Sequence, residues 1–318
     1  MRVLITGVAG FVGRHLAAHL FAEGGHEVWG LSRAGHDLPG LDSRIRLAVA
    51  DLTHRDSVAA AVAECRPEAI YHLASQASVK RSFDSPLETL QNNIVGQVHL
   101  LDACIVSAPA ARILVVGSNE EYGLTEPNEL PIRESKELRP VSPYAVSKVT
   151  QDMLGHQYFR ARRLQIVRVR PFTHIGPGQA PGFVTTDFAM QLALMELGRC
   201  EPTMSVGNLD GVRDFSDVRD VVRGYQLLIE QGEPGEVYNL GSGVGRTIRS
   251  LLDQMLELTT VRPTVVRDPS RMRPSEIPAM YADCSRIFAR TGWKTEIPFE
   301  QSLSDVMEDW RQRVRETV

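Results

Sequence analysis

Cysteine is scarce in this chain, with four copies among 318 residues. They stand far apart in the sequence, at Cys65, Cys104, Cys200 and Cys284. No two of them have the spacing of a zinc site or of a redox pair. We therefore predict reduced thiols, no metal centre and a cytoplasmic protein.

Long hydrophobic runs are missing as well. No apolar stretch approaches the roughly 20 residues that a membrane-spanning helix needs. The apolar start of the chain is interrupted at Arg14 and His15, and its glycines belong to a strand-to-helix turn that is described below. It is therefore not typical of a signal peptide.

No block of one charge stands out either. The chain has 35 Lys and Arg against 39 Asp and Glu, which gives a formal net charge of -4 with both signs interspersed. This pattern argues against a nucleic acid or an anionic membrane as the main partner. An anionic substrate must be bound by a few placed arginines.

Strand and helix patterns, in contrast, alternate from the first residues. Hydrophobic residues make up 43% of the chain and charged residues 23%, as in a soluble globular protein. Strands that alternate with helices predict a parallel, doubly wound sheet, whose buried strands should be apolar throughout. The predicted strands are Arg2–Thr6, Glu27–Leu31, Ile45–Ala50, Ala69–Leu73, Ile113–Val116 and Gln165–Val169, and the predicted helices are Phe11–Ala22, Ser57–Cys65, Pro86–Val106 and Tyr144–Arg162.

The pattern changes after Arg170. Pro171–Phe183 is rich in proline and glycine and predicts a loop, and a helix follows at about Thr186–Gly198. Val237–Leu240 is predicted as a late strand that returns to the sheet. The remainder, Thr247–Val318, alternates short helices and loops.

Together these patterns predict an α/β protein with two closely packed parts. The first, residues 1–170 with the return strand, is a Rossmann-type doubly wound parallel sheet. The second, residues 171–318, is a smaller C-terminal α/β domain for substrate. No repeat or flexible linker separates them.

A glycine-rich turn joins the first strand to the first helix, with the sequence Gly7-Val8-Ala9-Gly10-Phe11-Val12-Gly13. Glycine lets the chain turn tightly, lets backbone N–H groups approach a pyrophosphate, and lets the helix pack close to the strand. The helix N-terminus then faces the phosphates with its positive end. The turn predicts a dinucleotide cofactor, and the alternative is a plain strand-to-helix turn.

The end of the second strand should select the cofactor. NAD-specific folds place an acid there, but this strand runs into Ser32 and Arg33, with no acid until Asp37. A hydroxyl and a guanidinium suit a 2′-phosphate, so NADP(H) is favoured and NAD(H) is the alternative. Arg33 alternatively stacks over the adenine or points to solvent. Asp51 either reaches the adenine or caps the next helix.

A candidate catalytic pair stands at the start of a later helix. Ser142 fits the N-cap and Pro143 the first helical position, so Tyr144 and Lys148 lie at i and i+4 on one face. An ammonium beside a phenol favours the phenolate and lowers its pKa, which suits proton transfer. The alternative is an ordinary helix face.

Two further candidates follow the fifth strand. Ligands of doubly wound sheets lie outside the carboxyl ends of the strands. A Ser118 hydroxyl at such an end can hydrogen-bond a substrate oxygen beside Tyr144. Glu120 is either a second acid/base or a solvated loop charge.

Taken together, these residues resemble the extended short-chain dehydrogenase/reductase family over nearly the whole chain. The motifs that carry the resemblance, in the family's order, are GVAGFVG, HLASQASV, NNIVG, SNEEYG, YAVSK, VRD, YNLGSG and RPSE. The resemblance implies that Ser118, Tyr144 and Lys148 form the catalytic triad. In the family, the matching tyrosine exchanges a proton with a sugar oxygen, the lysine also holds the nicotinamide ribose, and the serine orients the substrate.

The resemblance also implies a cofactor site and a supporting residue. Asn93 matches a position that supports the lysine through the active-site helix and water. The expected cofactor-binding residues are Gly7, Gly10, Phe11, Val12, Gly13, Ser32, Arg33, Asp51, Leu52, Leu73, Ala74, Asn93, Tyr144, Lys148 and Pro171.

Within the family, the chain closely resembles bacterial GDP-6-deoxy-mannose reductases. The segments are HIGPGQ (174–179), GNL (207–209), RDF (213–215), RMRPSE (271–276) and TGWK (291–294). They imply NAD(P)H-dependent reduction of GDP-4-dehydro-6-deoxy-D-mannose to GDP-D-rhamnose. One departure is Thr173, which stands where that pattern has an asparagine that usually helps to bind the substrate.

The expected substrate is therefore a nucleotide-diphosphate sugar, with a GDP-sugar favoured. Arg213 and Arg273 can neutralise a diphosphate by forked hydrogen bonds, and Glu276 can accept from ribose or a base edge. The alternative is that these residues form surface ion pairs. The expected substrate-binding residues are Ser118, Glu120, Tyr144, Thr173, Val184, Arg213, Arg273 and Glu276.

Three classes of function remain open from the sequence. The first is the 4-reductase. The second is a nucleotide-sugar 4,6-dehydratase or 4-epimerase with tightly bound cofactor, because dehydratases of the family place a glutamate at the position of Glu120. The third is a non-catalytic dinucleotide sensor, which the intact Ser118, Tyr144 and Lys148 disfavour.

The resemblance also implies a homodimer, in which the helices Pro86–Val106 and Tyr144–Arg162 pair across a two-fold axis. Both helices carry apolar residues on more than one face. These residues are Leu100, Leu101, Ile105, Met153, Leu154 and Tyr158. The alternative is that all of them face the sheet.

Overall fold

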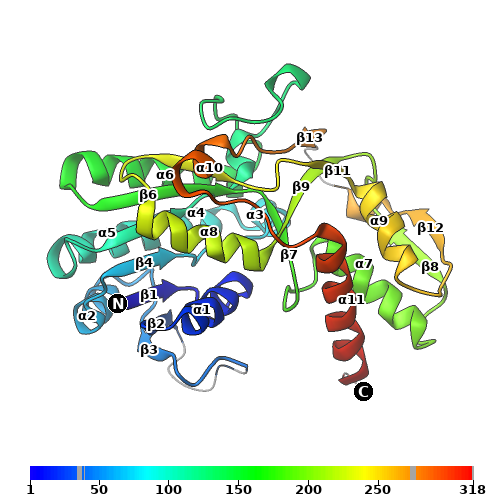
Figure 1. Ribbon diagram of the computed structural model, residues 1–318, viewed down its shortest axis with the longest axis horizontal. Coiled ribbons are helices and arrows are strands. Elements are labelled where there is room, and N and C mark those ends of the chain that lie inside the picture. Colours follow the sequence, from blue (N-terminus) through cyan, green and yellow to red (C-terminus); the bar gives the residue numbers. More distant parts are fainter. Residues whose placement is uncertain (34–37, 39, 273–276, 317–318) are drawn as a thin grey trace.

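The computed structural model describes residues 1–33, 38, 40–272 and 277–316, arranged as two lobes (Figure 1). The first lobe contains a seven-stranded sheet in the order β10-β6-β5-β4-β1-β2-β3. Every neighbouring pair in it is parallel. The strands are β1 Arg2–Thr6, β2 Glu27–Ser32, β3 Arg46–Val49, β4 Ala69–His72, β5 Arg112–Val116, β6 Gln165–Pro171 and β10 Val237–Leu240.

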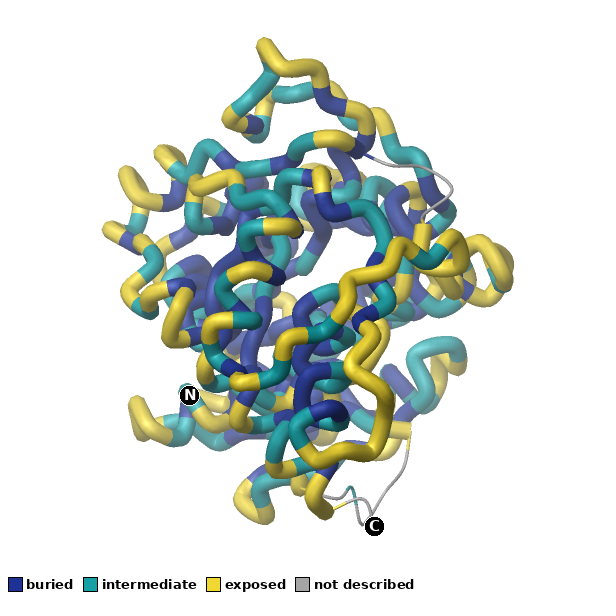
Figure 2. Tube along the Cα trace, turned by 90° about the vertical axis from the view of Figure 1, so that its right-hand side faces the viewer, coloured by how far each residue is buried: buried dark blue, intermediate teal, exposed yellow. Residues whose placement is uncertain are grey.

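Helices cover both faces of this sheet, because its strands are apolar on both. Val3 and Ile5 of β1 pack into one hydrophobic layer, whereas Leu4 between them packs into the other. In Figure 2 the buried trace lies inside the lobe and the exposed trace surrounds it. The predicted Rossmann-type doubly wound sheet is confirmed.

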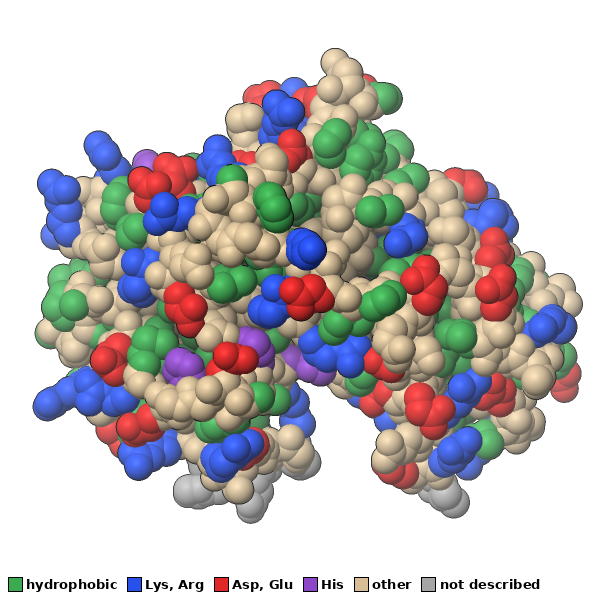
Figure 3. Space-filling model, viewed as in Figure 1, with side chains coloured by type: hydrophobic (Ala, Val, Ile, Leu, Met, Phe, Trp, Pro, Cys, Tyr) green, Lys and Arg blue, Asp and Glu red, His purple; other side chains and the backbone are tan. Residues whose placement is uncertain are grey.

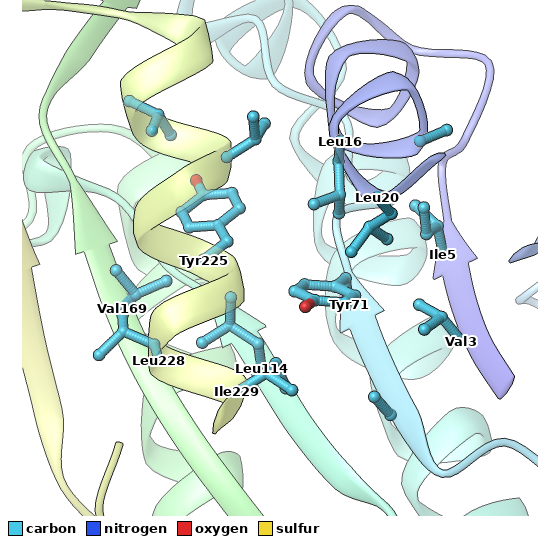
Figure 4. Packing of buried hydrophobic residues seen from close by; sticks show 14 of the residues in the cluster. Val3, Ile5, Leu16, Leu20, Tyr71, Leu114, Val169, Tyr225, Leu228 and Ile229 are labelled. Carbon is cyan, nitrogen blue, oxygen red and sulfur yellow. The ribbon is translucent and has the colours of Figure 1, made fainter. Parts of the chain in front are cut away.

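The two faces are covered by different sets of helices. On one face, α1 (Phe11–Glu23) and α8 (Val218–Gln231) enclose Tyr71 and Leu114, as Figure 4 shows. On the other face, residues of α2 (Arg55–Cys65), α5 (Gly96–Ser107) and α6 (Pro143–Arg162) form the second layer.

The predicted helix Pro86–Val106 differs in detail. It is divided into α4 (Pro86–Leu90), a π-helical turn over Gln91–Val95, and α5. A short helix precedes it, α3 (Val79–Asp84). A π turn inserts one extra residue per turn and often marks a functional site.

The second lobe is built from a mixed sheet, a two-stranded sheet and three helices. Its elements are β7 Thr173–Ile175, β8 Thr203–Val206, β9 Val212–Asp217, β11 Gly245–Thr247, β12 Thr264–Arg267, β13 Ala279–Met280, α7 Val184–Glu196, α9 Ile248–Glu257 and α11 Phe299–Glu316. The three helices enclose a separate hydrophobic core with residues such as Phe188, Leu252 and Trp310.

Two details of the second half differ from the sequence prediction. Thr173–Ile175 is a strand paired with β9, inside the stretch predicted as a loop. The chain ends with α11, an 18-residue helix, where only short helices were predicted. A two-part division at residue 170 stays an interpretation, since α8, β10 and α10 (Ser285–Thr291) all pack onto the first lobe.

None of the described helices is long and apolar enough to cross a membrane.

Candidate active site

A cleft of about 990 Å³ separates the glycine turn of the first lobe from the segments 179–187 and 268–272 of the second. The space-filling view shows the surface notched between the two lobes, with both charge signs interspersed around it (Figure 3). Most residues predicted for the site line this cleft. They are Gly7, Gly10, Phe11, Val12, Gly13, Leu73, Ala74, Ser118, Glu120, Tyr144, Lys148, Pro171 and Thr173.

The glycine turn has the geometry of a phosphate cradle. Gly7 has φ +74°, and a Cβ there would lie 3.0 Å from the backbone of Ala74. A Cβ on Gly13 would collide with the carbonyl oxygen of Gly7 and lie 2.7 Å from Cα of Val8. The helix N-cap, Gly10, has no side chain, so the first amides of α1 face the cleft without a protein cap. The residues present therefore fit a dinucleotide pyrophosphate.

The predicted catalytic side chains lie just after β5 and on α6. Ser142 accepts from the backbone N–H of Ala145 at 3.1 Å, and Pro143 opens α6, as predicted. Tyr144 and Lys148 thus lie one turn apart on the buried face of this helix. Ser118, just after β5, hydrogen-bonds Tyr144.

Burial controls the protonation of Tyr144. The sequence predicts that Lys148 lowers the pKa of this phenol, but the Lys148 Nζ lies 5.9 Å from the ring centroid. Burial raises the pKa of Tyr144 above its ordinary value, and Glu120 and Glu121 raise it further, against a lowering hydrogen bond from Ser118. The prediction was wrong for the protein alone, and Tyr144 is a phenol at neutral pH.

Lys148 is buried beneath Tyr144 and donates to the carbonyl oxygen of Val116 at 2.9 Å. Burial lowers the pKa of this ammonium to about 8, and Glu121 opposes that shift only in its ionised form. Behind it lies His72, whose Nδ1 is 2.8 Å from Thr6 Oγ1. Burial, aided by Lys148, lowers the pKa of His72 to about 3, so this ring is neutral.

The low pKa of Lys148 leads to a testable pH dependence. If the ammonium is the working form, kcat/KM is constant below pH about 8 and falls about tenfold per pH unit above it. The measurement is kcat/KM for the reduced cofactor between pH 6 and pH 10. A flat profile across this range would exclude the ammonium of Lys148 from the reaction.

Several predicted cofactor residues do not line the cleft. Asp51 Oδ1 instead accepts from Thr53 N at 2.8 Å and from Thr53 Oγ1 at 2.7 Å. These bonds lie in the turn before α2, whose N-cap is His54, so Asp51 does not cap that helix as the alternative predicted. Leu52 packs against Gly96 of α5. Ser32 ends β2 and Arg33 follows it, both outside the cleft lining, and Arg33 acts electrostatically on Asp51.

Asn93 is fully buried in the π turn and also lies behind the cleft wall. Its Oδ1 accepts from Gln76 N at 2.7 Å, and its Nδ2 donates to Ser147 Oγ at 2.8 Å. Ser147 in turn donates to the carbonyl oxygen of Tyr144 at 2.7 Å. Asn93 therefore contacts α6 one residue before Lys148 and does not line the cleft.

The predicted substrate residues Val184 and Arg213, on the second lobe, lie outside the cleft lining. Val184 begins α7 and packs against the second core, beside a cleft-lining Phe183. Arg213 lies on β9 outside the cleft lining and donates to the carbonyl oxygen of Val212 at 2.8 Å. Arg273 and Glu276 lie outside the described residues.

One arginine in the cleft was not predicted from the sequence. Arg271 Nη1 lies 3.1 Å from Asp187 Oδ2, and both residues line the cleft. Asp187 is held in turn by the N–H of Gly182 at 2.8 Å. The RMRPSE segment signalled this region, but only Arg273 and Glu276 were selected from it.

A buried polar cluster beneath Ser118 was not predicted either. Glu121, Asp152, Arg168 and Arg170 are all at most 7% exposed and contact one another. Asp152 continues the row Tyr144, Lys148, Asp152 at four-residue spacing, a signal that was available in the sequence.

Comparison with known proteins identifies the family. The family model described as GDP-mannose 4,6 dehydratase matches residues 4–306. The chain belongs to this family, a branch of the extended short-chain dehydrogenases/reductases.

Individual members differ in their reactions. The chain is 38% identical to the GDP-6-deoxy-D-mannose reductase of Pseudomonas aeruginosa over 99% of both chains. It is 28% identical to the GDP-mannose 4,6-dehydratase of Yersinia enterocolitica, over 96% of this chain and 92% of that one.

Similar solved structures share the fold. RMD from Pseudomonas aeruginosa, in complex with NADPH, has a TM-score of 0.86 and 34% identity, covering 98% of this chain and 99% of that one. A UDP-glucose 4-epimerase from Thermotoga maritima, with UDP-glucose, has a TM-score of 0.90 and 26% identity, covering 99% of this chain and 100% of that one.

Proposed function

We propose that the protein reduces the C4 ketone of a nucleotide-linked 4-keto-6-deoxy sugar with a reduced nicotinamide dinucleotide. The substrate that we favour is GDP-4-dehydro-6-deoxy-D-mannose, which yields GDP-D-rhamnose. The observation that carries the proposal is the full-length 38% identity to a GDP-6-deoxy-D-mannose reductase, in a chain whose cleft holds Ser118, Tyr144 and Lys148 together.

The cofactor would be held along the first lobe. Gly7, Gly10 and Gly13 would hold its pyrophosphate by backbone N–H groups at the start of α1. Lys148 would hold the nicotinamide ribose near β5. When bound, the reduced nicotinamide supplies a hydride to the sugar.

The protein's own part is to bind the ketone and protonate its oxygen. Ser118 donates a hydrogen bond to that oxygen and orients it. Tyr144 then gives its proton, because a neutral phenol is the acid that a developing alkoxide needs. Once the cofactor is bound, the ammonium of Lys148 would favour the resulting phenolate by electrostatic attraction.

The nucleotide diphosphate would extend from the sugar towards the second lobe. Arg271 is the guanidinium that lines this wall among the described residues, and Asp187 holds it. A diphosphate can take the place of this single carboxylate by forked hydrogen bonds. We therefore add Arg271 to Arg213, Arg273 and Glu276 as candidates for substrate binding.

The reductase proposal is tested by the fate of the hydride. NADPH carrying deuterium on the transferred position should place one deuterium at C4 of the product sugar. Mass spectrometry and NMR of the product decide the position. Product that lacks the label would mean that the ketone was not reduced from the cofactor.

A second candidate is the 4,6-dehydratase, because Glu120 lines the cleft and acts electrostatically on Tyr144. A dehydratase needs a base there for the C5 proton, whereas a reductase does not. Incubation with GDP-D-mannose alone separates the two: a dehydratase releases a 4-keto-6-deoxy sugar and a reductase leaves GDP-D-mannose unchanged. If Glu120→Gln abolished such a release in a protein that showed it, the protein would belong with the dehydratases.

We expect NADPH to be preferred over NADH. Arg33 at the end of β2 can bind a 2′-phosphate, and one charge-assisted hydrogen bond of about 1.5–3 kcal/mol corresponds to roughly 10- to 150-fold in kcat/KM. Kinetics with both cofactors measure the ratio. Arg33→Ala should lower it towards one, whereas Arg44→Ala, which removes the ion pair with Asp42 away from the cleft, should not. Equal efficiency with NADH in the wild type would reject the preference.

We also propose a homodimer through α4, α5 and α6, but with different residues from those named in the sequence. Leu100 and Leu101 are fully buried, and Ile105, Leu154 and Tyr158 pack against the sheet. The alternative that they face the sheet therefore holds for all but Met153. The apolar side chains exposed on these helices and the π turn are Leu87, Val95, Val106, Val146 and Met153.

Light scattering tests the dimer. The wild type should have twice the chain mass of 35.3 kDa at micromolar concentration. The double variant L87E/M153E should be a monomer, because each glutamate would bury a charge at the interface. Val265→Glu, at an exposed valine of β12 in the other lobe, is the control and should remain a dimer. A monomeric wild type would refute the proposal.

A further inference from the structure

Glu121 is a buried acid immediately beneath the proposed catalytic serine. It is fully buried in the 3₁₀ turn Asn119–Tyr122 that follows β5. Its Oε1 accepts from the backbone N–H of Ser118 at 2.8 Å. A Cβ on Gly117 would collide with this same oxygen, so the carboxyl group lies directly under the strand end.

The other oxygen of Glu121 has no donor among the described residues. Its Oε2 lies 3.0 Å from Arg170 Nε, but the N–H of that nitrogen is directed to Asp152 Oδ2 at 2.7 Å. Since one N–H satisfies one acceptor well, an ionised Oε2 would be a buried charge without a hydrogen bond.

Asp152, in contrast, is fully satisfied as a carboxylate. One of its oxygens accepts from Arg170 and the other from Arg168, two buried guanidiniums that lie two residues apart on strand β6. A proton on Glu121 Oε2 removes the problem, because the resulting O–H can donate to Asp152.

We infer that Glu121 is a positioning residue that works as a neutral carboxylic acid, joining the Ser118 turn to the Asp152 face of α6. That face also carries Tyr144 and Lys148, at four-residue spacing from Asp152. The acid thereby fixes the distance between Ser118 on one element and the tyrosine–lysine pair on the other. The inference concerns the arrangement that the proposed reduction uses, but its protonation state can be measured without substrate.

The surroundings of Glu121 support the neutral form. Burial and the neighbouring Asp152 raise the pKa of Glu121 well above its ordinary value, and Arg170 opposes them only in part. The charged and titratable groups that face Glu121 are Asp152, Tyr144 and Lys148 of α6, Arg170 of β6, and Tyr122 of its own turn.

Infrared spectroscopy of the protein without ligands tests the protonation state. A neutral carboxylic acid has a C=O stretch that carboxylates lack, so the wild type should show this band at pH 7. It should be lost in Glu121→Gln and kept in Glu64→Gln, which removes an exposed carboxyl of α2. A wild-type spectrum without the band, or a band that persists in E121Q, would overturn the neutral form.

Kinetics test the positioning role. Glu121→Leu should lower kcat by about 10- to 100-fold with little change in KM for the reduced cofactor, because a small misplacement of reacting groups is costly. Glu121→Gln should restore most of this loss and keep the wild-type pH profile, since its amide can still accept from Ser118 and donate to Asp152. A wild-type kcat in E121L would exclude the role.

The pH profile of E121Q separates the neutral acid from a charged one. If Glu121 were ionised, the loss of its charge would lower the pKa of Lys148 and shift the alkaline limb to lower pH. Such a shift would overturn the inference even if E121L did not fold. Because the infrared measurement needs no substrate, its result on the protonation state of Glu121 would remain valid if the reductase proposal failed.

Discussion

Replacing Tyr144 with phenylalanine is expected to lower kcat by about 10²–10⁴-fold, the usual range for the loss of a general acid. As the ketone is reduced, its oxygen gains negative charge and needs a proton. Tyr144 lies beside Ser118 in the cleft and is a neutral phenol, because burial raises its pKa. Phenylalanine keeps the ring and its packing but removes that proton.

The binding of the cofactor should survive this change. The glycine turn and Lys148 are untouched, so the dissociation constant of NADPH in Y144F should stay within about threefold of the wild type, as measured by fluorescence titration. Tyr158→Phe is a matched control, because it removes a phenol on the same helix that donates to Asp102 rather than lining the cleft. A wild-type turnover in Y144F would show that another group is the acid.

The second large effect is expected at the glycine turn. Gly13→Ala places a methyl group against the carbonyl oxygen of Gly7 and 2.7 Å from Cα of Val8. Backbone cannot move aside as a flexible side chain does, so the turn itself must shift. Overpacking of this kind costs about 1–3 kcal/mol. We expect NADPH to bind roughly 5- to 150-fold more weakly.

A glycine in an open position provides the control for this variant. A Cβ on Gly211 meets only the side chain of Arg213, at 3.5 Å, which is ordinary contact. Gly211→Ala should therefore bind NADPH as the wild type does. If G13A also bound NADPH normally, the turn would not be the phosphate cradle.

The first lobe could be predicted closely from the sequence because its signals are local. The strands Arg2–Thr6 and Val237–Leu240 were predicted with the observed bounds, since each is a buried apolar run. Ser142 and Pro143 likewise marked the start of α6. The π turn at Gln91–Val95 gave no such signal, because it leaves the apolar pattern of the helix intact.

The parts of the site that were missed depend on contacts between distant residues. Glu120 and Glu121 are adjacent acids, and only the 3₁₀ turn determines that Glu120 lines the cleft whereas Glu121 lies beneath it. The burial of Leu100 and Leu101 could not be predicted either, because their helix is apolar on more than one face and the pattern does not show which face packs on the sheet.

The second lobe posed the same difficulty for arginines. Arg213 lies in the short strand β9 and Arg271 at the end of a 3₁₀ turn, and nothing in the local sequence pattern shows which of them faces the cleft. The fold directs Arg271 to the cleft by fixing its segment on Val206, at the end of β8, through a 2.8 Å backbone hydrogen bond from Asp268.

The proposed activity is tested most directly by incubating the purified protein with GDP-4-dehydro-6-deoxy-D-mannose and NADPH while following the absorbance of the reduced cofactor. A reductase consumes one NADPH for each ketone, and the product is a GDP-linked 6-deoxy sugar without a carbonyl group. The absorbance should therefore fall in the wild type and stay nearly constant in Y144F. A constant absorbance in the wild type, together with release of a 4-keto-6-deoxy sugar from GDP-D-mannose, would contradict the reductase and favour the dehydratase.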